Sequence, residues 1–154
     1  MLNMKQYSEA ALREVIEAHD NWLHPAQPLG RRASFCHADL RLRDFRGLDL
    51  SGADFSGADL YSANFRGSIL EGADFSHANL QCANLRHTNL VGVNFTGAIL
   101  DYCVLDDADC QKIQVDKTGA AYLLREGLEI WRLACDDREF RTIQTQLIRF
   151  CKRA

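Results

Sequence analysis

The feature that most constrains this chain is a five-residue repeat that runs from Ala33 to Lys112. Each of its sixteen units is centred on Phe, Leu or, once, Cys. Ala stands two residues before the centre in ten units, and Asp or Asn stands between the two in twelve. An α-helix repeats about every 3.6 residues and a β-strand about every 2, so neither element alone accounts for a period of five.

The spacing within one unit predicts a short extended segment followed by a corner. Residues two apart on an extended segment point to the same side, and the residue between them points to the other. The central residue and the residue two before it therefore face inward, while Asp or Asn faces outward. Gly is frequent at the last position of the unit, as a tight corner requires. Repeated corners of one hand wind the chain into a coil whose strands stack at about 4.8 Å.

The order of Phe and Leu at the central position decides how many sides the coil has. The two residues alternate without exception from residue 35 to residue 80. A three-sided coil would stack each Phe on a Leu, whereas a four-sided coil of twenty residues stacks like on like. We therefore predict a mainly β fold, a four-sided parallel β-helix of about four coils. Two of its core columns are Phe35, Phe55, Phe75 and Phe95, and Leu40, Leu60, Leu80 and Leu100.

The tandem pattern A(D/N)(L/F)xx over residues 33–112 resembles the pentapeptide repeat family. This resemblance implies a right-handed quadrilateral β-helix and a largely non-catalytic role. The best understood members look like rods of DNA-like charge that bind DNA gyrase and confer quinolone resistance. Two inward positions of the first coil depart from the pattern, because Arg43 and Leu48 stand where Ala is usual.

A solenoid exposes its core at both ends, so capping elements are required. Residues 1–30 are predicted to form an N-terminal cap, with a helix over 8–23 that begins at the N-cap Ser8. The β-helix itself is expected over residues 31–112. Residues 113–154 are predicted to form a C-terminal helical cap, with helices over 116–126 and after 136 or 137, and strand or loop left open over 128–135. This tail is longer than a cap needs, which indicates a second role such as dimerisation.

Charge and composition argue against several classes of protein. A net charge of −3 is too small for a general nucleic-acid binder, which usually carries a basic excess. No apolar run approaches the roughly 20 residues of a membrane span, and the first residues lack the apolar core of a signal peptide. The six cysteines form no C-x-x-C pair, which favours free thiols. We expect a cytoplasmic protein without a membrane or direct nucleic-acid partner.

No pattern indicates catalysis or a bound cofactor. His77, Cys82 and His87 fall on three diverging corners of one coil, whereas zinc ligands must converge to about 2.0–2.3 Å. Cys103 and Cys110 fall on inward positions, where Cys acts as a small hydrophobe. Nucleophile elbows and phosphate-binding loops are absent from the sequence, and a convex prism offers little concave pocket. We expect no enzyme, no metal site and no cofactor.

One charged feature departs from the repeat. Arg46, Arg66 and Arg86 lie twenty residues apart, so we expect them to form a ladder up one side. Arg41 lies one side away, and Asp106 ends the ladder. Like charges in register repel one another, so another interaction must offset the repulsion between the three arginines. Either Asp44, solvent and stacking of the guanidinium planes do so, or the ladder is a docking stripe for an acidic partner.

A second departure is apolar. Ile99, Tyr102 and Val104 face outward late in the repeat, with Ile69 and Val91 on or near the next side. A cluster of exposed apolar residues indicates a contact surface. We expect cover either from the C-terminal helices folding back or from a second copy in a symmetric dimer.

Two functions follow from these observations. The first is a non-catalytic scaffold that presents the faces and ends of a rigid prism to an unidentified protein partner. The second, implied by the family resemblance, is a DNA mimic that binds gyrase. A mimic needs a long and strongly negative surface, which the small net charge and the arginine ladder do not provide.

Overall fold

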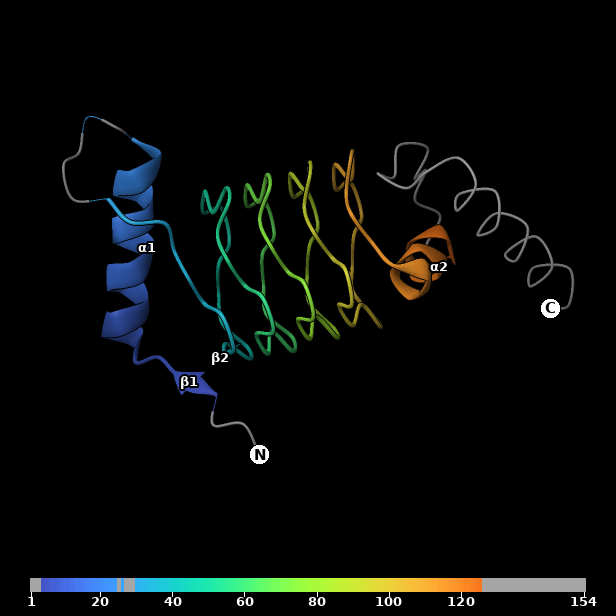
Figure 1. Cartoon of the computed structure of the whole chain (residues 1–154), viewed down its shortest axis with the longest axis horizontal. Helices are drawn as coiled ribbons and strands as arrows, with labels where there is room; N and C mark the ends of the chain where they lie inside the picture. Colours follow the sequence, from blue (N-terminus) through green and yellow to red (C-terminus); the bar gives the residue numbers. More distant parts are fainter. Residues whose placement is uncertain (1–3, 25, 27–29, 126–154) are drawn as a thin grey trace, which may run out of the picture.

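The structure, a computed structural model, describes residues 4–24, 26 and 30–125. Along the chain it contains strand β1 (Lys5–Gln6), helix α1 (Glu9–Leu23), strand β2 (Ala38–Asp39) and helix α2 (Lys117–Arg125). Between the two helices the chain winds as a stack of similar coils, with α1 against the first coil and α2 at the opposite end (Figure 1). Among the described residues, no helix has the length and apolar character that a membrane crossing requires.

The stack has a register of twenty residues. Parallel bridges join each outward residue to the one twenty positions later, as in Asn64 with Asn84 and Ile69 with Asn89. Four units of five residues therefore make one coil, which confirms the prediction of four sides. We name the sides by their central residues: face A holds 35, 55, 75 and 95, face B holds 40, 60, 80 and 100, face C holds 45, 65, 85 and 105, and face D holds 50, 70, 90 and 110.

The corner of each unit is a tight turn. The N–H that opens one unit donates to the carbonyl of the preceding central residue, as from Ala53 to Leu50 at 3.0 Å. The last residue of every unit from 33 to 112 has a positive φ, between 53° and 71°. A positive φ at the third turn residue is the mark of a type II turn, which favours Gly. Gly fills seven of these positions, and nine other residues fill the rest.

The outward Asp or Asn also helps to build the corner. Asp49 Oδ1 accepts a hydrogen bond from the N–H of Ser51 at 3.0 Å, and Asn84 Oδ1 accepts one from Arg86 at 3.1 Å. This Asx-turn recurs along the repeat and satisfies a backbone donor that the stacked coils leave without a partner. The preference for Asp or Asn therefore has a structural cause beyond facing the solvent.

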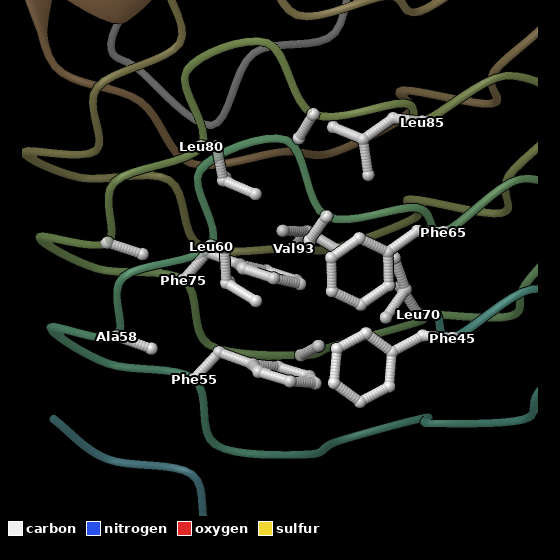
Figure 2. Packing of buried hydrophobic residues seen from close by; sticks show 14 of the residues in the cluster. Phe45, Phe55, Ala58, Leu60, Phe65, Leu70, Phe75, Leu80, Leu85 and Val93 are labelled. Carbon is white, nitrogen blue, oxygen red and sulfur yellow. The ribbon is translucent and has the colours of Figure 1, made fainter. Parts of the chain in front are cut away.

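In the first two coils the core is a double column of aromatic rings between two columns of leucine, and leucine replaces phenylalanine on face C in the later coils. The Phe residues of faces A and C are fully buried and stack within each face, as for Phe55 and Phe75 at 4.7 Å and Phe45 and Phe65 at 4.9 Å. Across the axis the two columns meet edge to face, with Phe55 and Phe65 centred 5.6 Å apart (Figure 2). Both arrangements are favourable for aromatic pairs. All eight residues expected in the two core columns are buried, at 4% exposure or less.

Helix α1 packs against the first coil. Ser8 caps it by accepting a hydrogen bond from the N–H of Ala11, and Leu12 is buried. Tyr7 packs edge to face on Phe35 at 5.7 Å. Strand β1, which the sequence pattern did not predict, pairs in parallel with β2 of the first coil.

The contact between the N-terminal cap and the first coil explains the irregular inward position of Arg43. The Arg43 guanidinium forms an ion pair with Glu9 of α1 and donates to the Tyr7 carbonyl at 2.8 Å. Arg43 therefore points toward the N-terminal helix rather than into the narrow interior. Leu48 is partly buried against the hydrophobic core.

Helix α2 begins after Asp116, whose Oδ1 accepts hydrogen bonds from the N–H groups of Thr118 and Gly119. Tyr122 on this helix is buried and donates from its hydroxyl to the Cys103 carbonyl at 3.1 Å. The expectations for residues 128–135 and for a second C-terminal helix lie outside the described residues.

Candidate functional site

Face C brings the arginine ladder into one column. Each unit of this face presents, in order, an outward residue, the central residue and then a solvent-facing position. Because the coil repeats every twenty residues, that last position holds Arg46, Arg66, Arg86 and Asp106 on successive coils. All four are exposed. The three arginines therefore lie in register, as their spacing predicts, and their partners decide what the column can bind.

The first arginine is paired within its own unit. Arg46 Nη2 lies 2.6 Å from Asp44 Oδ2, and its Nε donates to both oxygens of the same carboxylate. Hydrogen bonding from the Arg46 side chain lowers the pKa of Asp44. Asp44 thus offsets the charge of Arg46, as one of the two explanations of the ladder proposed.

The third arginine is paired with the residue that ends the ladder. Arg86 Nε donates to Asp106 Oδ2 at 2.8 Å, across one coil. Beside this pair, His87 Nδ1 lies 3.4 Å from Asp107 Oδ2, again twenty residues away. An arginine–carboxylate ion pair and a histidine–carboxylate contact therefore lie next to one another at the C-terminal end of face C.

Arg66, in the middle of the ladder, differs from both neighbours. Its backbone N–H donates to Asn64 Oδ1 at 3.2 Å, and Asn64 stands where the first coil has Asp44. In the described part of the chain, the ion pairs of the ladder involve Arg46 and Arg86 and leave Arg66 without one. An open depression of about 300 Å³ lies beside it, lined by Arg66, Asn84, Arg86, His87, Asp106 and Asp107.

Sequence reasoning placed Arg66, Arg86 and Asp106 together but missed the rest of this depression. His87 was considered only as a metal ligand, and Asp107 and Asn84 were not singled out. The signal was available, because positions 87 and 107 are twenty residues apart and carry opposite charge when His is protonated.

Arg41, the fourth candidate arginine, lies on face B and is held there by carboxylates. Its Nη2 is 2.6 Å from Asp39, and its Nε is 3.6 Å from Asp59. Gln6 of β1 donates to Asp39 as well, at 2.9 Å. The hydrogen bond from the Arg41 side chain, and next that from Gln6, hold the pKa of Asp39 well below its usual range. Arg41 and Gln6 of β1 therefore bind the same carboxylate, that of Asp39, where β1 pairs with the first coil.

The outward apolar residues lie near the edge between faces B and C. Tyr102 is 76% exposed and Ile99 46% exposed, while Val104 is half-buried. Val104 bridges to Asn84, so it lies in face C directly beyond a residue that lines the depression. The C-terminal cover expected for these residues lies outside the described residues, and the symmetric dimer stays a prediction.

The described residues contain no group of three or more His, Cys, Asp or Glu side chains that could hold a metal ion. Burial raises the pKa of the Cys103 thiol to about 12 and that of Cys110 to about 11. These thiols stay protonated near neutral pH and are poor nucleophiles.

A four-sided solenoid built from units of five residues, with outward Asp or Asn and inward Phe or Leu, defines a class of repeat protein. The sequence profile of pentapeptide repeats matches this chain in overlapping segments, over residues 31–67, 44–77, 58–97 and 78–110. The chain therefore belongs to the pentapeptide repeat family, whose members fold as right-handed quadrilateral β-helices and are generally structural proteins rather than enzymes.

Solved structures of pentapeptide repeat proteins resemble the chain. One from Nostoc PCC 7120 is 32% identical, over 71% of this chain and 80% of that protein, with a TM-score of 0.35. One from the thylakoid lumen of Arabidopsis thaliana is 26% identical, over 56% and 74%, with a TM-score of 0.26. QnrB1, a plasmid-mediated fluoroquinolone resistance protein, is 20% identical, over 70% and 75%, with a TM-score of 0.31. A search of curated proteins found no match.

Proposed function

We propose that this protein is a non-catalytic scaffold that binds an acidic segment of a partner protein on face C, with Arg66 as the principal contact. The observation that carries the proposal is the difference between Arg66 and its neighbours. Arg46 and Arg86 each contact a carboxylate of the same chain, whereas Arg66 stands between them without one. A partner carboxylate at this position would complete the pattern of the ladder.

The electrostatics of the column favour an added carboxylate at Arg66. The neighbouring arginines are attached to coils about 4.8 Å above and below, and the charge of each is already offset by Asp44 or Asp106. A carboxylate bound to Arg66 therefore displaces no existing ion pair. Arginine also presents a planar fork that matches the geometry of a carboxylate.

The fold supports such a role because its faces are rigid. Each coil is joined to the next by backbone hydrogen bonds at about 2.6–3.1 Å on every side, and the interior is filled by stacked rings. Side chains on face C are therefore held at fixed heights. Binding to such a surface costs little ordering of the backbone.

The test is affinity capture with the full chain from a lysate of its native host. One variant replaces Arg46, Arg66 and Arg86 with Ser, and a matched control replaces the exposed Arg13, Arg31 and Arg32, so that both lose three positive charges. We expect a partner to be retained by the wild type and the control and lost by the face C variant, and its binding to weaken with salt. Equal capture by all three proteins would overturn the proposal, as would recovery of no partner.

A further inference from the structure

The depression beside Arg66 contains negative charge as well as positive charge. Its lining residues include two arginines and two aspartates. Arg86 and Asp106 offset each other through their ion pair at 2.8 Å. Arg66 and Asp107 are the other two, and both line the same depression. The charge pattern of the depression therefore depends on the contacts of Arg66 and Asp107.

Asp107 is less completely paired than Asp106. Its carboxylate lies 3.4 Å from the imidazole of His87, and this is its one ion contact among the described residues. An imidazole is charged only when it is protonated, whereas a guanidinium does not lose its proton in proteins. The side chain of Asp107 is 79% exposed, so a partner in solution can reach it. Asp107 thus presents a negative charge that the chain offsets only in part.

The two incompletely paired charges lie at different heights on face C. Arg66 belongs to the second coil and Asp107 to the fourth. The coils that carry them are about 10 Å apart along the axis, because each coil adds about 4.8 Å. Arg86 and His87 belong to the third coil, between them. In the described part of the chain no ion pair joins Arg66 to Asp107. The depression therefore presents a positive and a negative charge at two separate points.

We propose that the partner segment bound on face C carries both an acidic and a basic residue, and that Asp107 is the contact for the basic one. This inference rests on the proposed function of face C and adds the chemical character of the segment. The carboxylate of the segment binds Arg66, and its ammonium or guanidinium group binds Asp107. Residues two apart on an extended chain point to the same side and lie about 7 Å apart. The long side chains of Glu and Lys can cover the remaining distance.

A segment with acidic residues alone fits the depression less well, because Asp107 would repel a second carboxylate beside it. The two kinds of segment predict opposite effects of removing the charge of Asp107. Binding of an acid-only segment would strengthen, because a repulsion is lost. Binding of a mixed segment would weaken, because an attractive contact is lost. The sign of the change therefore decides between them.

Asp107→Asn removes this charge with little effect on the fold. Asp107 has a φ of 56°, in the left-handed region that Asn adopts readily. Asp101→Asn is the matched control, because Asp101 is exposed on the same coil but belongs to face B. Asp107→Lys reverses the charge, and Lys112 already occupies an equivalent corner with a φ of 57°. All three variants should keep the melting temperature of the wild type within about 3 °C.

The probe is the peptide acetyl-Ser-Glu-Ser-Lys-Ser-amide, added to the full-length ¹⁵N-labelled protein and followed by NMR. We expect saturable shifts of amides on face C, including those of residues 66 and 107. Arg66→Ser should weaken binding at least tenfold and Asp107→Asn at least threefold, while Asp101→Asn leaves it unchanged. Replacing Lys of the peptide by Glu should weaken binding to the wild type and strengthen binding to the Asp107→Lys variant.

The outcomes separate this inference from the function on which it rests. If Asp107→Asn binds the peptide or the captured partner as tightly as the wild type does, or more tightly, Asp107 contacts no basic residue and the inference is overturned. Failure of the peptide to bind at millimolar concentration would overturn it as well. In either case, loss of partner capture in the triple arginine variant would still support the face C scaffold.

Discussion

The last position of each five-residue unit imposes the same positive φ on residues with different surroundings. At Gly67 an added Cβ would meet nothing within 4 Å, so only the backbone conformation opposes a side chain. At Gly57 the imidazole of His37, from the coil below, occupies the space that a Cβ would take. The same relation recurs between His77 and Gly97. Comparing Gly67 with Gly57 therefore separates the free-energy cost of a positive φ from the cost of a steric clash with a neighbouring side chain.

We predict that Gly67→Ala lowers the free energy of unfolding by about 1 kcal/mol, because Ala at positive φ is unfavourable. Gly57→Ala should cost up to about 1 kcal/mol more, since the exposed His37 ring must leave its preferred position. The measurement is chemical denaturation of both variants, together with the double variant His37→Ala, Gly57→Ala. Truncating His37 should remove the extra loss of stability caused by Gly57→Ala. The steric explanation would be contradicted if the double variant lost as much free energy of unfolding as the single variants His37→Ala and Gly57→Ala lose together.

At the scale of elements, the contact between helix α1 and the first coil depends on a buried histidine. His19 is fully buried and stacks on Trp22 at 5.4 Å. Its Nδ1 lies 3.0 Å from the backbone nitrogen of Ala33 and accepts a hydrogen bond from it, which requires an unprotonated Nδ1. Nε2 is buried and has no hydrogen-bond partner in the described structure. Protonation would therefore remove an acceptor and bury a charge.

This geometry makes the stability of the N-terminal cap depend on pH. Burial lowers the pKa of His19 below its usual 6.5, and the charge of Arg32 acts in the same direction. Asp49, the backbone of Ser51 and Asp20 oppose this shift without cancelling it. The unfolded chain then binds a proton more readily than the folded one, so the stabilisation is complete above pH 6.5. It is lost as pH falls from 6.5 toward the folded-state pKa.

The test compares wild type with His19→Gln, which retains an acceptor but does not titrate. We predict that the free energy of unfolding of the wild type falls between pH 7.5 and 5 more steeply than that of the variant. The protection factors of amides in α1, which correct for the pH dependence of intrinsic hydrogen exchange, should fall over the same range in the wild type. Parallel pH profiles for the two proteins would show that His19 does not control the cap.

The period of five and the order of Phe and Leu were sufficient to predict the four-sided fold, because both follow from which side chains share a face. The same reasoning located helix α1 within one residue at its start, since Ser8 is a local signal. What the sequence did not reveal depends on contacts between distant segments. The ion pair of Arg43 with Glu9 and the pairing of β1 with β2 both require the cap to be docked. Register alone places Arg66 and Arg86 in one column, but only side-chain conformations show that one is paired and the other is not.

At the scale of the whole molecule, the distribution of charge argues against imitation of DNA. Face C carries arginines in the column where a mimic would need carboxylates, and face B pairs Arg41 with Asp39 and Asp59. The net charge is only −3. We predict that the purified protein neither inhibits DNA supercoiling by gyrase nor protects the enzyme from a quinolone. Inhibition or protection at stoichiometric concentrations would restore the DNA-mimic hypothesis.

The central claim is that recognition resides in the unpaired member of the ladder rather than in its overall positive charge. The most direct test is the dissociation constant of the captured partner for the single variants Arg46→Ser, Arg66→Ser and Arg86→Ser, measured by calorimetry. We predict that Arg66→Ser weakens binding at least tenfold, while Arg46→Ser and Arg86→Ser, whose arginines already contact Asp44 and Asp106, each change it less than threefold. Equal losses for all three variants would contradict the account, because they would mean that the partner senses only the summed charge of face C.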